Sequence, residues 1–301
     1  MLIEGADGVS FLQALVSNDV ARLAVGQGAF ATYLTPQGRM IADLEVYRRP
    51  DGVLLGVTDG VAEALATRLD LSVFSEDVRV SDVSARLTEL LVIGSGAAKL
   101  LASAFGVDAG SLDGLAELSQ LDCDGGFIAR VAESRLPSFK IIAEAEDQTS
   151  IVNRLERAGV IHLSEALAVA LRVEAGRPLF GVDLSIETIP LEAGLLDRAI
   201  STTKGCYVGQ EIIIRILHRG GGRVAKRLAL LDITGADVPA PGTVLRGGDR
   251  DVGQLTSVSR SPDGGSVIAL GFVARDFAEV GQELRVAGVD TGVARVTGFA
   301  G

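Results

Sequence analysis

Lys204-Gly205-Cys206-Tyr207-Val208-Gly209-Gln210-Glu211 is the stretch that says most about this chain. It places an amine, a thiol, a phenol, an amide and a carboxylate within eight positions, interrupted by two glycines. A glycine inside a helix or strand costs about 0.5–1 kcal/mol relative to alanine, so both glycines favour a bend or a close backbone approach. The neighbouring Lys204 favours a reactive thiolate at Cys206. A tight turn with a half-buried cysteine is the alternative interpretation.

The octapeptide resembles the signature of the YgfZ-type folate-binding proteins, within the superfamily of the glycine-cleavage T-protein. Other stretches resemble that superfamily in the same order along almost the whole chain. They are residues 11–13, 17–20, 38–43, 172–178 with 180–181, 253–257 and 269–271. The resemblance implies two mixed domains and a C-terminal barrel around a folate pocket.

Composition narrows the class of protein. A chain of 301 residues suits two or three packed domains. Its formal net charge of −11 argues against broad binding to nucleic acid or anionic membrane. Two cysteines, Cys123 and Cys206, make no disulfide framework, and two histidines add no zinc site. The start lacks a secretory signal and no apolar run reaches eighteen residues, so we expect a soluble, cytoplasmic protein.

The first eighty or so residues predict mixed α and β structure. Asp7 is expected to cap a short helix, and Asp59 to start a second one. A hairpin turn is expected at residues 35–38, where proline and glycine stand at the second and fourth positions. Strands are expected at residues 30–34, 40–47, 53–57 and 78–80.

The middle of the chain predicts a ferredoxin-like βαββαβ order. The expected strands are residues 89–93, 127–131, 139–143 and 161–163, and the expected helices are 97–105 and 148–158. Gly94-Ser95-Gly96 suggests a phosphate loop, but Lys99 stands where the dinucleotide fingerprint needs a third glycine. A plain strand-to-helix turn is therefore the preferred interpretation.

Short apolar runs separated by turn residues predict a small antiparallel barrel after residue 227. The expected strands are residues 228–233, 252–258, 267–273, 283–286 and 293–298. The expected fold class is therefore α+β, a T-protein-like fold with a ferredoxin-like middle domain and a C-terminal antiparallel β-barrel. We expect an N-terminal mixed part at 1–85, a ferredoxin-like domain at 86–165, a return segment with both motifs at 166–226 and the barrel at 227–301.

Glu174 is the residue that we expect to bind the pterin ring of folate. A carboxylate accepts two adjacent N–H groups of a pterin edge, and the resemblance assigns this role to the matching glutamate. Arg172 is expected to orient Glu174, unless the two form a structural ion pair. Asp43 is a further candidate for the pocket. T-proteins carry two acidic residues in this hairpin, and Ala42 replaces one of them here.

Basic residues gather between Glu211 and Arg227, against the acidic balance of the chain. Guanidinium groups pair with carboxylates, so Arg215 and Arg223 are candidates for the glutamate tail of folate. A solvated basic connector is the alternative. Gln210 and Glu211 complete the expected cofactor-binding residues.

Cys206 distinguishes the chain from an aminomethyl-transferring T-protein. In the YgfZ-like family this cysteine is linked to assembly or repair of iron–sulfur enzymes, including those that thiolate transfer RNA. Lys204 and Tyr207 are expected to assist it. One cysteine cannot hold a cluster alone, which favours a transient contact with a client or assembly protein.

These observations lead to a main prediction and two alternatives. The main one is a tetrahydrofolate-binding protein of the YgfZ type that acts in iron–sulfur protein maturation and is not a conventional enzyme. The first alternative is a tetrahydrofolate-dependent aminomethyltransferase or demethylase. The second is an interaction module that keeps the fold and binds no folate.

Overall fold

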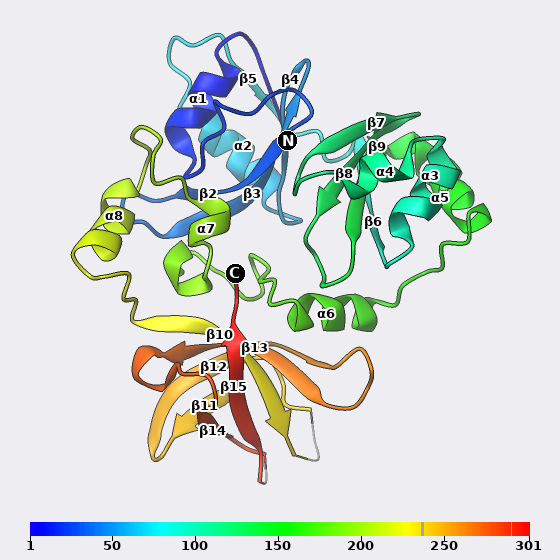
Figure 1. Cartoon of the computed structure of the whole chain (residues 1–301). Helices are drawn as coiled ribbons and strands as arrows, with labels where there is room; N and C mark the ends of the chain where they lie inside the picture. The colour runs from blue at the N-terminus through cyan, green and yellow to red at the C-terminus, as the bar shows by residue number, and fades with distance from the viewer. Residues whose placement is uncertain (236–237, 290) are drawn as a thin grey trace. The chain divides into compact units, whose positions relative to one another are not determined.

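The computed structural model describes residues 1–235, 238–289 and 291–301. These residues form two compact units (Figure 1). Unit 1 comprises Met1–Tyr33, Ala42–His162 and Ala199–Val208. Unit 2 comprises Leu34–Ile41, Leu163–Arg198 and Gly209–Gly301. The octapeptide therefore begins in unit 1 and ends in unit 2.

A five-stranded sheet with the order β2-β3-β4-β1-β5 contains the first strands of the chain. The strands are β1 (Leu2–Glu4), β2 (Gly28–Leu34), β3 (Met40–Arg49), β4 (Gly52–Gly56) and β5 (Arg79–Ser81), and the helices are α1 (Gly8–Leu15) and α2 (Ala62–Asp70). The hairpin turn forms as predicted, with the Gly38 N–H donating to the Thr35 carbonyl at 2.8 Å.

Two helix starts in this region differ from the prediction. Helix α2 begins at Ala62 instead of Asp59, because Gly60 has φ of +79° and cannot belong to a right-handed helix. Asp7 precedes α1 but makes no side-chain capping bond. Its carboxylate instead accepts the backbone N–H of Asp77 at 2.9 Å.

The second sheet of unit 1 has the order β6-β9-β8-β7, and all its neighbouring strands are antiparallel. Its elements are β6 (Leu87–Ile93), α3 (Ala97–Phe105), α4 (Ala109–Asp113), β7 (Gln120–Cys123), β8 (Gly126–Val131), β9 (Ser138–Glu144) and α5 (Gln148–Arg157). The predicted βαββαβ order is wrong at its last strand. Residues 161–163 form no strand, and the side chain of Ile161 is 86% exposed. Strand β7 was not predicted, although the Asp124-Gly125 pair that follows it is a hairpin signal.

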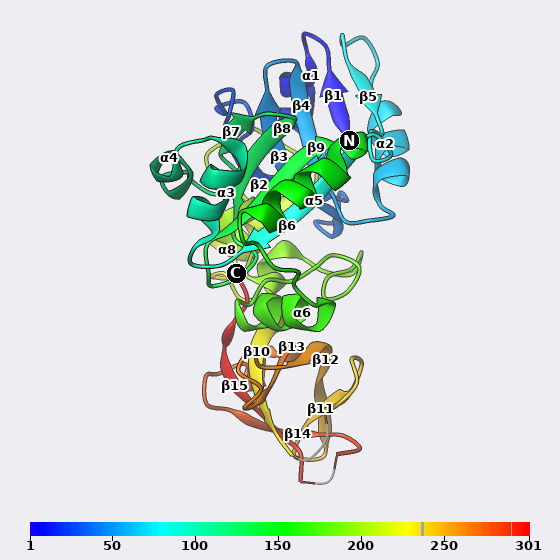
Figure 2. The same ribbon diagram turned by 90° about the vertical axis from the view of Figure 1, so that its right-hand side faces the viewer.

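Alternate side chains of this second sheet serve two separate cores. Ile128 and Ile141 pack with helices α3, α4 and α5, and Figure 2 shows α5 lying along the sheet. Phe127 and Ile142 point to the other face, where they pack with Tyr47 and Leu54 of the first sheet. The two sheets of unit 1 therefore share one core.

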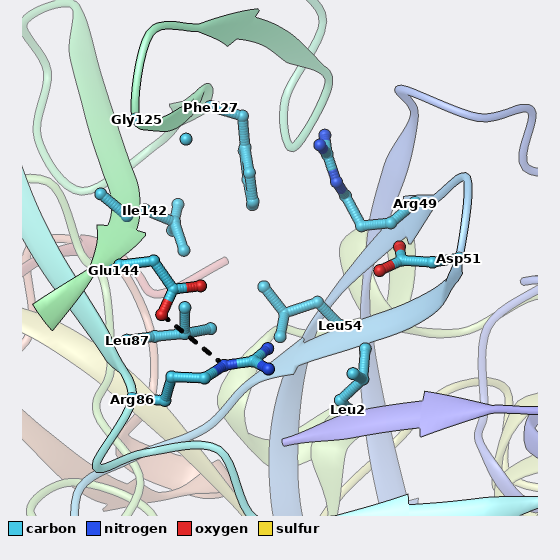
Figure 3. A pocket seen from close by; sticks show the side chains of 12 residues that line it. Leu2, Arg49, Asp51, Leu54, Arg86, Leu87, Gly125, Phe127, Ile142 and Glu144 are labelled. Carbon is cyan, nitrogen blue, oxygen red and sulfur yellow. Dashed lines mark ion pairs between the residues drawn. The ribbon is translucent and has the colours of Figure 1, made fainter.

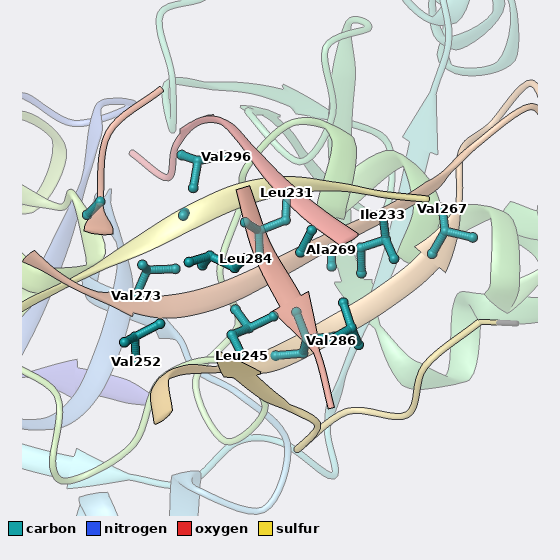
Figure 4. Packing of buried hydrophobic residues seen from close by; sticks show 14 residues of the cluster. Leu231, Ile233, Leu245, Val252, Val267, Ala269, Val273, Leu284, Val286 and Val296 are labelled. Atoms are coloured by element: carbon teal, nitrogen blue, oxygen red, sulfur yellow. The ribbon is translucent and has the colours of Figure 1, made fainter. Parts of the chain in front are cut away.

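Unit 2 contains a closed barrel with the order β10-β13-β12-β11-β14-β15. Its strands are β10 (Lys226–Thr234), β11 (Val244–Gly247), β12 (Arg250–Arg260), β13 (Val267–Ala274), β14 (Glu283–Val286) and β15 (Val293–Phe299). Figure 4 shows the interior, where residues such as Leu231, Leu245 and Val296 meet. Closure leaves no free sheet edge. The α+β fold with a C-terminal antiparallel barrel is confirmed, with the four-residue β11 as an addition.

The remaining helices lie between the second sheet and the barrel in the sequence. They are α6 (Glu165–Glu174), α7 (Leu196–Ala199) and α8 (Gln210–His218). Ser164 caps α6, since its hydroxyl accepts the backbone N–H of Leu167. Helix α6 carries both residues predicted for the pterin, and α8 follows directly from the octapeptide.

Candidate functional site

Lys204 is buried in unit 1 and binds the backbone at the end of α1. Its Nζ donates to the carbonyls of Gln13, Val16 and Asn18 at 2.6, 2.7 and 2.8 Å. Carbonyls at the end of a helix have no partner within it, and a cation is favoured there. Burial lowers the pKa of Lys204 to about 8. Because all three protons are held by carbonyls, Lys204 fixes the loop, and its role in assisting the Cys206 thiol stays a prediction.

Cys206 is exposed, which differs from the alternative of a half-buried turn cysteine. A Cβ atom added at the neighbouring Gly205 would meet nothing within 4 Å, so the space beside the thiol is open. Cys123 lies half-buried on β7. Burial raises the pKa of its thiol to about 11, and Asp122 and Asp124 act in the same direction. The two thiols therefore differ sharply in accessibility.

Gly209 lets two backbone segments of unit 2 meet. Its φ is +83°, and an added Cβ would lie 2.5 Å from the carbonyl oxygen of Thr35. Gly38 is equally constrained, with φ of +71° and Ile212 of α8 against it. The start of α8 thus rests on the hairpin turn. The glycine pattern predicted such a close backbone approach at both positions. The structure has it at Gly209, whereas no atom of the described residues approaches Gly205 in this way.

The basic segment is mostly exposed. Gln210 is the first residue of α8 and is half-buried. Glu211 and Arg215 form an exposed pair at 2.9 Å along α8. Arg223 is exposed and donates to the carbonyl of Gly220 at 3.2 Å. The Arg215 and Arg223 side chains therefore remain candidates for an anionic ligand.

Arg172 forms a structural ion pair with a partner that the sequence did not predict. Its guanidinium pairs with Asp183 at 2.6 Å and donates to the Arg177 carbonyl and the Ser257 hydroxyl, each at 2.7 Å. Asp183, whose side chain is fully buried, also accepts the hydroxyl of Thr256 at 2.5 Å. This network joins α6 to β12 of the barrel. The alternative of an ion pair between Arg172 and Glu174 is therefore wrong, and the orienting role of Arg172 stays a prediction.

Glu174 is the last residue of α6 and is half-buried. Among the residues that the structure describes, no hydrogen bond or ion pair satisfies its carboxylate. A carboxylate that no protein group binds can accept N–H donors from a ligand. Asp43 is also half-buried, on β3 in unit 1, next to the fully buried Ala42.

A second charged cluster, centred on Lys140, was not predicted from the sequence. Lys140 on β9 binds both oxygens of Glu45 at 2.9 and 2.8 Å, and Glu89 at 2.8 Å. The hydroxyl of Tyr47 donates to Glu45 at 2.8 Å. Burial lowers the pKa of Lys140, but the carboxylates outweigh this effect and raise it above its ordinary value. The cluster is internally satisfied and joins the two sheets of unit 1.

A small cavity lies between the two sheets of unit 1 (Figure 3). Its volume is about 170 Å³, and its walls include Leu54, Phe127 and Ile142. Three of its charged residues have partners nearby, since Arg86 faces Glu144 at 3.7 Å and Arg49 stacks on the Phe127 ring at 4.4 Å. The cavity is therefore a gap in the core that the two sheets of unit 1 share.

A metal-binding cluster and a membrane-spanning helix are both absent from the part of the chain that the structure describes. No group of three or more histidine, cysteine, aspartate or glutamate residues there could hold a metal ion. Within the same residues, no helix has the length and apolar character needed to cross a bilayer.

Comparisons with known families agree with this architecture. The model of the GCVT N-terminal domain matches residues 1–204. The model of the glycine cleavage T-protein C-terminal barrel domain matches residues 226–296.

Individual relatives cover nearly the whole chain. A Nostoc protein named aminomethyltransferase is 30% identical over 291 residues, spanning 94% of this chain and 77% of that protein. An aminomethyltransferase of Listeria welshimeri is 26% identical over 288 residues, spanning 95% and 79%. The crystal structure of glycine cleavage system aminomethyltransferase T from Bartonella henselae matches 98% of this chain and 81% of its own. Its TM-score is 0.87 at 22% identity, which shows a shared fold.

Proposed function

The chain belongs to the glycine cleavage T-protein family, and from this premise we propose that it binds tetrahydrofolate or a one-carbon derivative of it. The observation that carries the proposal is Glu174. Its half-buried carboxylate has no partner among the described residues, and a pterin edge supplies the adjacent N–H donors that such a group accepts. The donor and acceptor chemistry therefore fits the cofactor.

The glutamate tail is the part of folate that we assign to the basic segment. Arg215 and Arg223 are exposed, and exposed guanidinium groups pair with carboxylates. Gln210, Glu211 and Asp43 are further candidates for contacts with the cofactor. Arg172 supports this site indirectly, because it holds the helix that carries Glu174.

Aminomethyl transfer to tetrahydrofolate is the activity that the relatives favour. Proteins from Nostoc and Listeria that match almost the whole chain carry the name aminomethyltransferase. This supports the first alternative of the sequence analysis over its main prediction. Ala42, which stands where the resemblance implies an acidic residue, is the feature against it.

Iron–sulfur protein maturation of the YgfZ type is the second candidate, and the exposure of Cys206 supports it. A thiolate is a soft metal ligand and a nucleophile, and an open thiol beside Gly205 leaves room for a client protein. The partners in this case are iron–sulfur client or assembly proteins, including enzymes of transfer RNA modification, in the cytoplasm.

Two assays distinguish the aminomethyltransferase, the iron–sulfur maturation protein and the interaction module. Calorimetric titration of the wild-type protein with tetrahydrofolate tests the proposal itself, and absence of binding would leave only an interaction module. Formation of methylene-tetrahydrofolate from an aminomethyl carrier then tests for the aminomethyltransferase. Turnover supports the first activity, and binding without turnover supports the second.

Cys206→Ser is expected to bind tetrahydrofolate normally and to fail in restoring iron–sulfur enzyme activity to cells that lack the protein. The substitution changes little volume at an exposed position, but serine cannot supply a thiolate at neutral pH. The matched control is Cys123→Ser, which should complement fully. Full complementation by Cys206→Ser would exclude the thiol from the function.

A further inference from the structure

The hydroxyl group of Tyr207 is buried without a partner. The residue is only 7% exposed, and the hydroxyl oxygen has no hydrogen bond to any residue within 1–235, 238–289 or 291–301. Buried tyrosine hydroxyls usually find a partner, because an unsatisfied one lowers stability. This group is therefore a candidate to bind a ligand.

The surrounding loop is well held, so the unsatisfied hydroxyl is not a sign of a loose segment. The Lys204 Nζ lies 5.4 Å from the centre of the Tyr207 ring and is itself fixed by three carbonyls. Tyr47 shows the usual arrangement in the same unit, since its buried hydroxyl donates to Glu45. The buried hydroxyl of Tyr47 thus has a protein partner, whereas that of Tyr207 has none among the described residues.

The protonation state of the hydroxyl defines the missing partner. Burial raises the pKa of Tyr207 to about 12, so the phenol keeps its proton at neutral pH. A protonated hydroxyl facing no acceptor can donate to one that a ligand brings. The missing partner is therefore an acceptor atom.

We propose that the Tyr207 hydroxyl donates a hydrogen bond to an oxygen atom of the bound folate. This inference rests on the proposed function and adds Tyr207 to the residues that we propose for folate. Folate offers such oxygens on its pterin ring and on its benzoyl-glutamate part. A bond made only when the ligand is present would explain why the hydroxyl has no partner in the protein.

Tyr207→Phe tests this inference through two readouts with opposite signs. Without ligand, the variant should melt at a temperature equal to that of the wild type or about 2–4 °C higher, because it removes an unsatisfied polar group. Its affinity for tetrahydrofolate should fall by about three- to tenfold, the usual value of one neutral hydrogen bond. A parallel titration with 6-methyltetrahydropterin assigns the oxygen. An equal loss of affinity indicates the pterin, and a loss confined to tetrahydrofolate indicates the benzoyl-glutamate part.

Tyr47→Phe is the matched control. It removes a hydroxyl that has a partner, so it should lower the melting temperature and leave tetrahydrofolate affinity unchanged. A lower melting temperature for Tyr207→Phe would indicate that the hydroxyl has a protein or water partner in solution. Unchanged affinity would show that the hydroxyl does not bind folate. Either result would overturn the inference. If the wild type binds no tetrahydrofolate, the proposed function fails, and with it the ligand assigned to Tyr207.

Discussion

Asp183→Ala should lower the free energy of unfolding by about 3–5 kcal/mol, the usual effect of removing one partner from a buried ion pair. The Asp183 side chain is fully buried and receives the guanidinium of Arg172. It also accepts the Leu179 N–H at 3.0 Å and the Thr256 hydroxyl at 2.5 Å. The substitution leaves a largely buried cation unpaired, and urea unfolding would measure the loss.

The exposed Glu211–Arg215 pair provides the control for this substitution. Glu211→Ala should change stability by less than about 0.5 kcal/mol, because exposed helical pairs contribute little. The double substitution Arg172→Met with Asp183→Leu should be milder than Asp183→Ala, since it removes both charges together. If Asp183→Ala proved as harmless as Glu211→Ala, Arg172 would not be the structural residue described above.

Lys204→Met should lower the free energy of unfolding by about 2–3 kcal/mol, because it leaves carbonyl groups at the end of α1 without a donor. The cost of burying the ammonium is relieved at the same time, which keeps the net effect below the sum of three bonds. Methionine preserves most of the apolar length of the side chain. The measurement is again urea unfolding, combined with the rate of Cys206 alkylation as a report on the loop.

Lys99→Met is the control, since Lys99 is exposed on α3. It should leave both stability and Cys206 alkylation unchanged. Faster alkylation in Lys204→Met would show that the buried amine positions the loop. A stable Lys204→Met protein that had lost only thiol reactivity would instead support the predicted electrostatic role of Lys204.

Much of the fold could be predicted from the sequence, because hydrophobic periodicity and turn residues are local signals. The barrel strands around Leu231 and Ala269 follow from short apolar runs between turns. The errors occur where local pattern is weak. Three-residue β1 and four-residue β11 are too short to show a period, and residues 161–163 are apolar at both ends yet have no neighbouring strand.

The site was harder to predict, because its decisive contacts are distant in sequence. Lys204 binds carbonyls more than 180 residues away, and Arg172 meets Ser257 in the barrel. No spacing rule reveals such partners. Asp183 lies in a stretch without any local signal for a buried acid. The assignment of Glu174, the last residue of α6, to the pterin stays a prediction that rests on the family resemblance and the chemistry of a carboxylate.

The domain boundaries at residues 85, 165 and 226 remain our proposal. Family models assign 1–204 to an N-terminal domain and 226–296 to a barrel. Limited proteolysis followed by mass spectrometry would locate the exposed connections. The β10 strand begins at Lys226, so cleavage between residues 219 and 223 is the outcome that fits a separate barrel.

Titration of tetrahydrofolate into the wild type and Glu174→Ala tests the central claim most directly. Losing a charge-assisted contact costs about 1.5–3 kcal/mol, so the variant should bind roughly ten- to a hundredfold more weakly. Glu165→Ala, at the exposed first turn of the same helix, removes an equal charge and should bind like the wild type. Equal affinity of the folded Glu174→Ala protein and the wild type would contradict the assignment of Glu174 to the pterin.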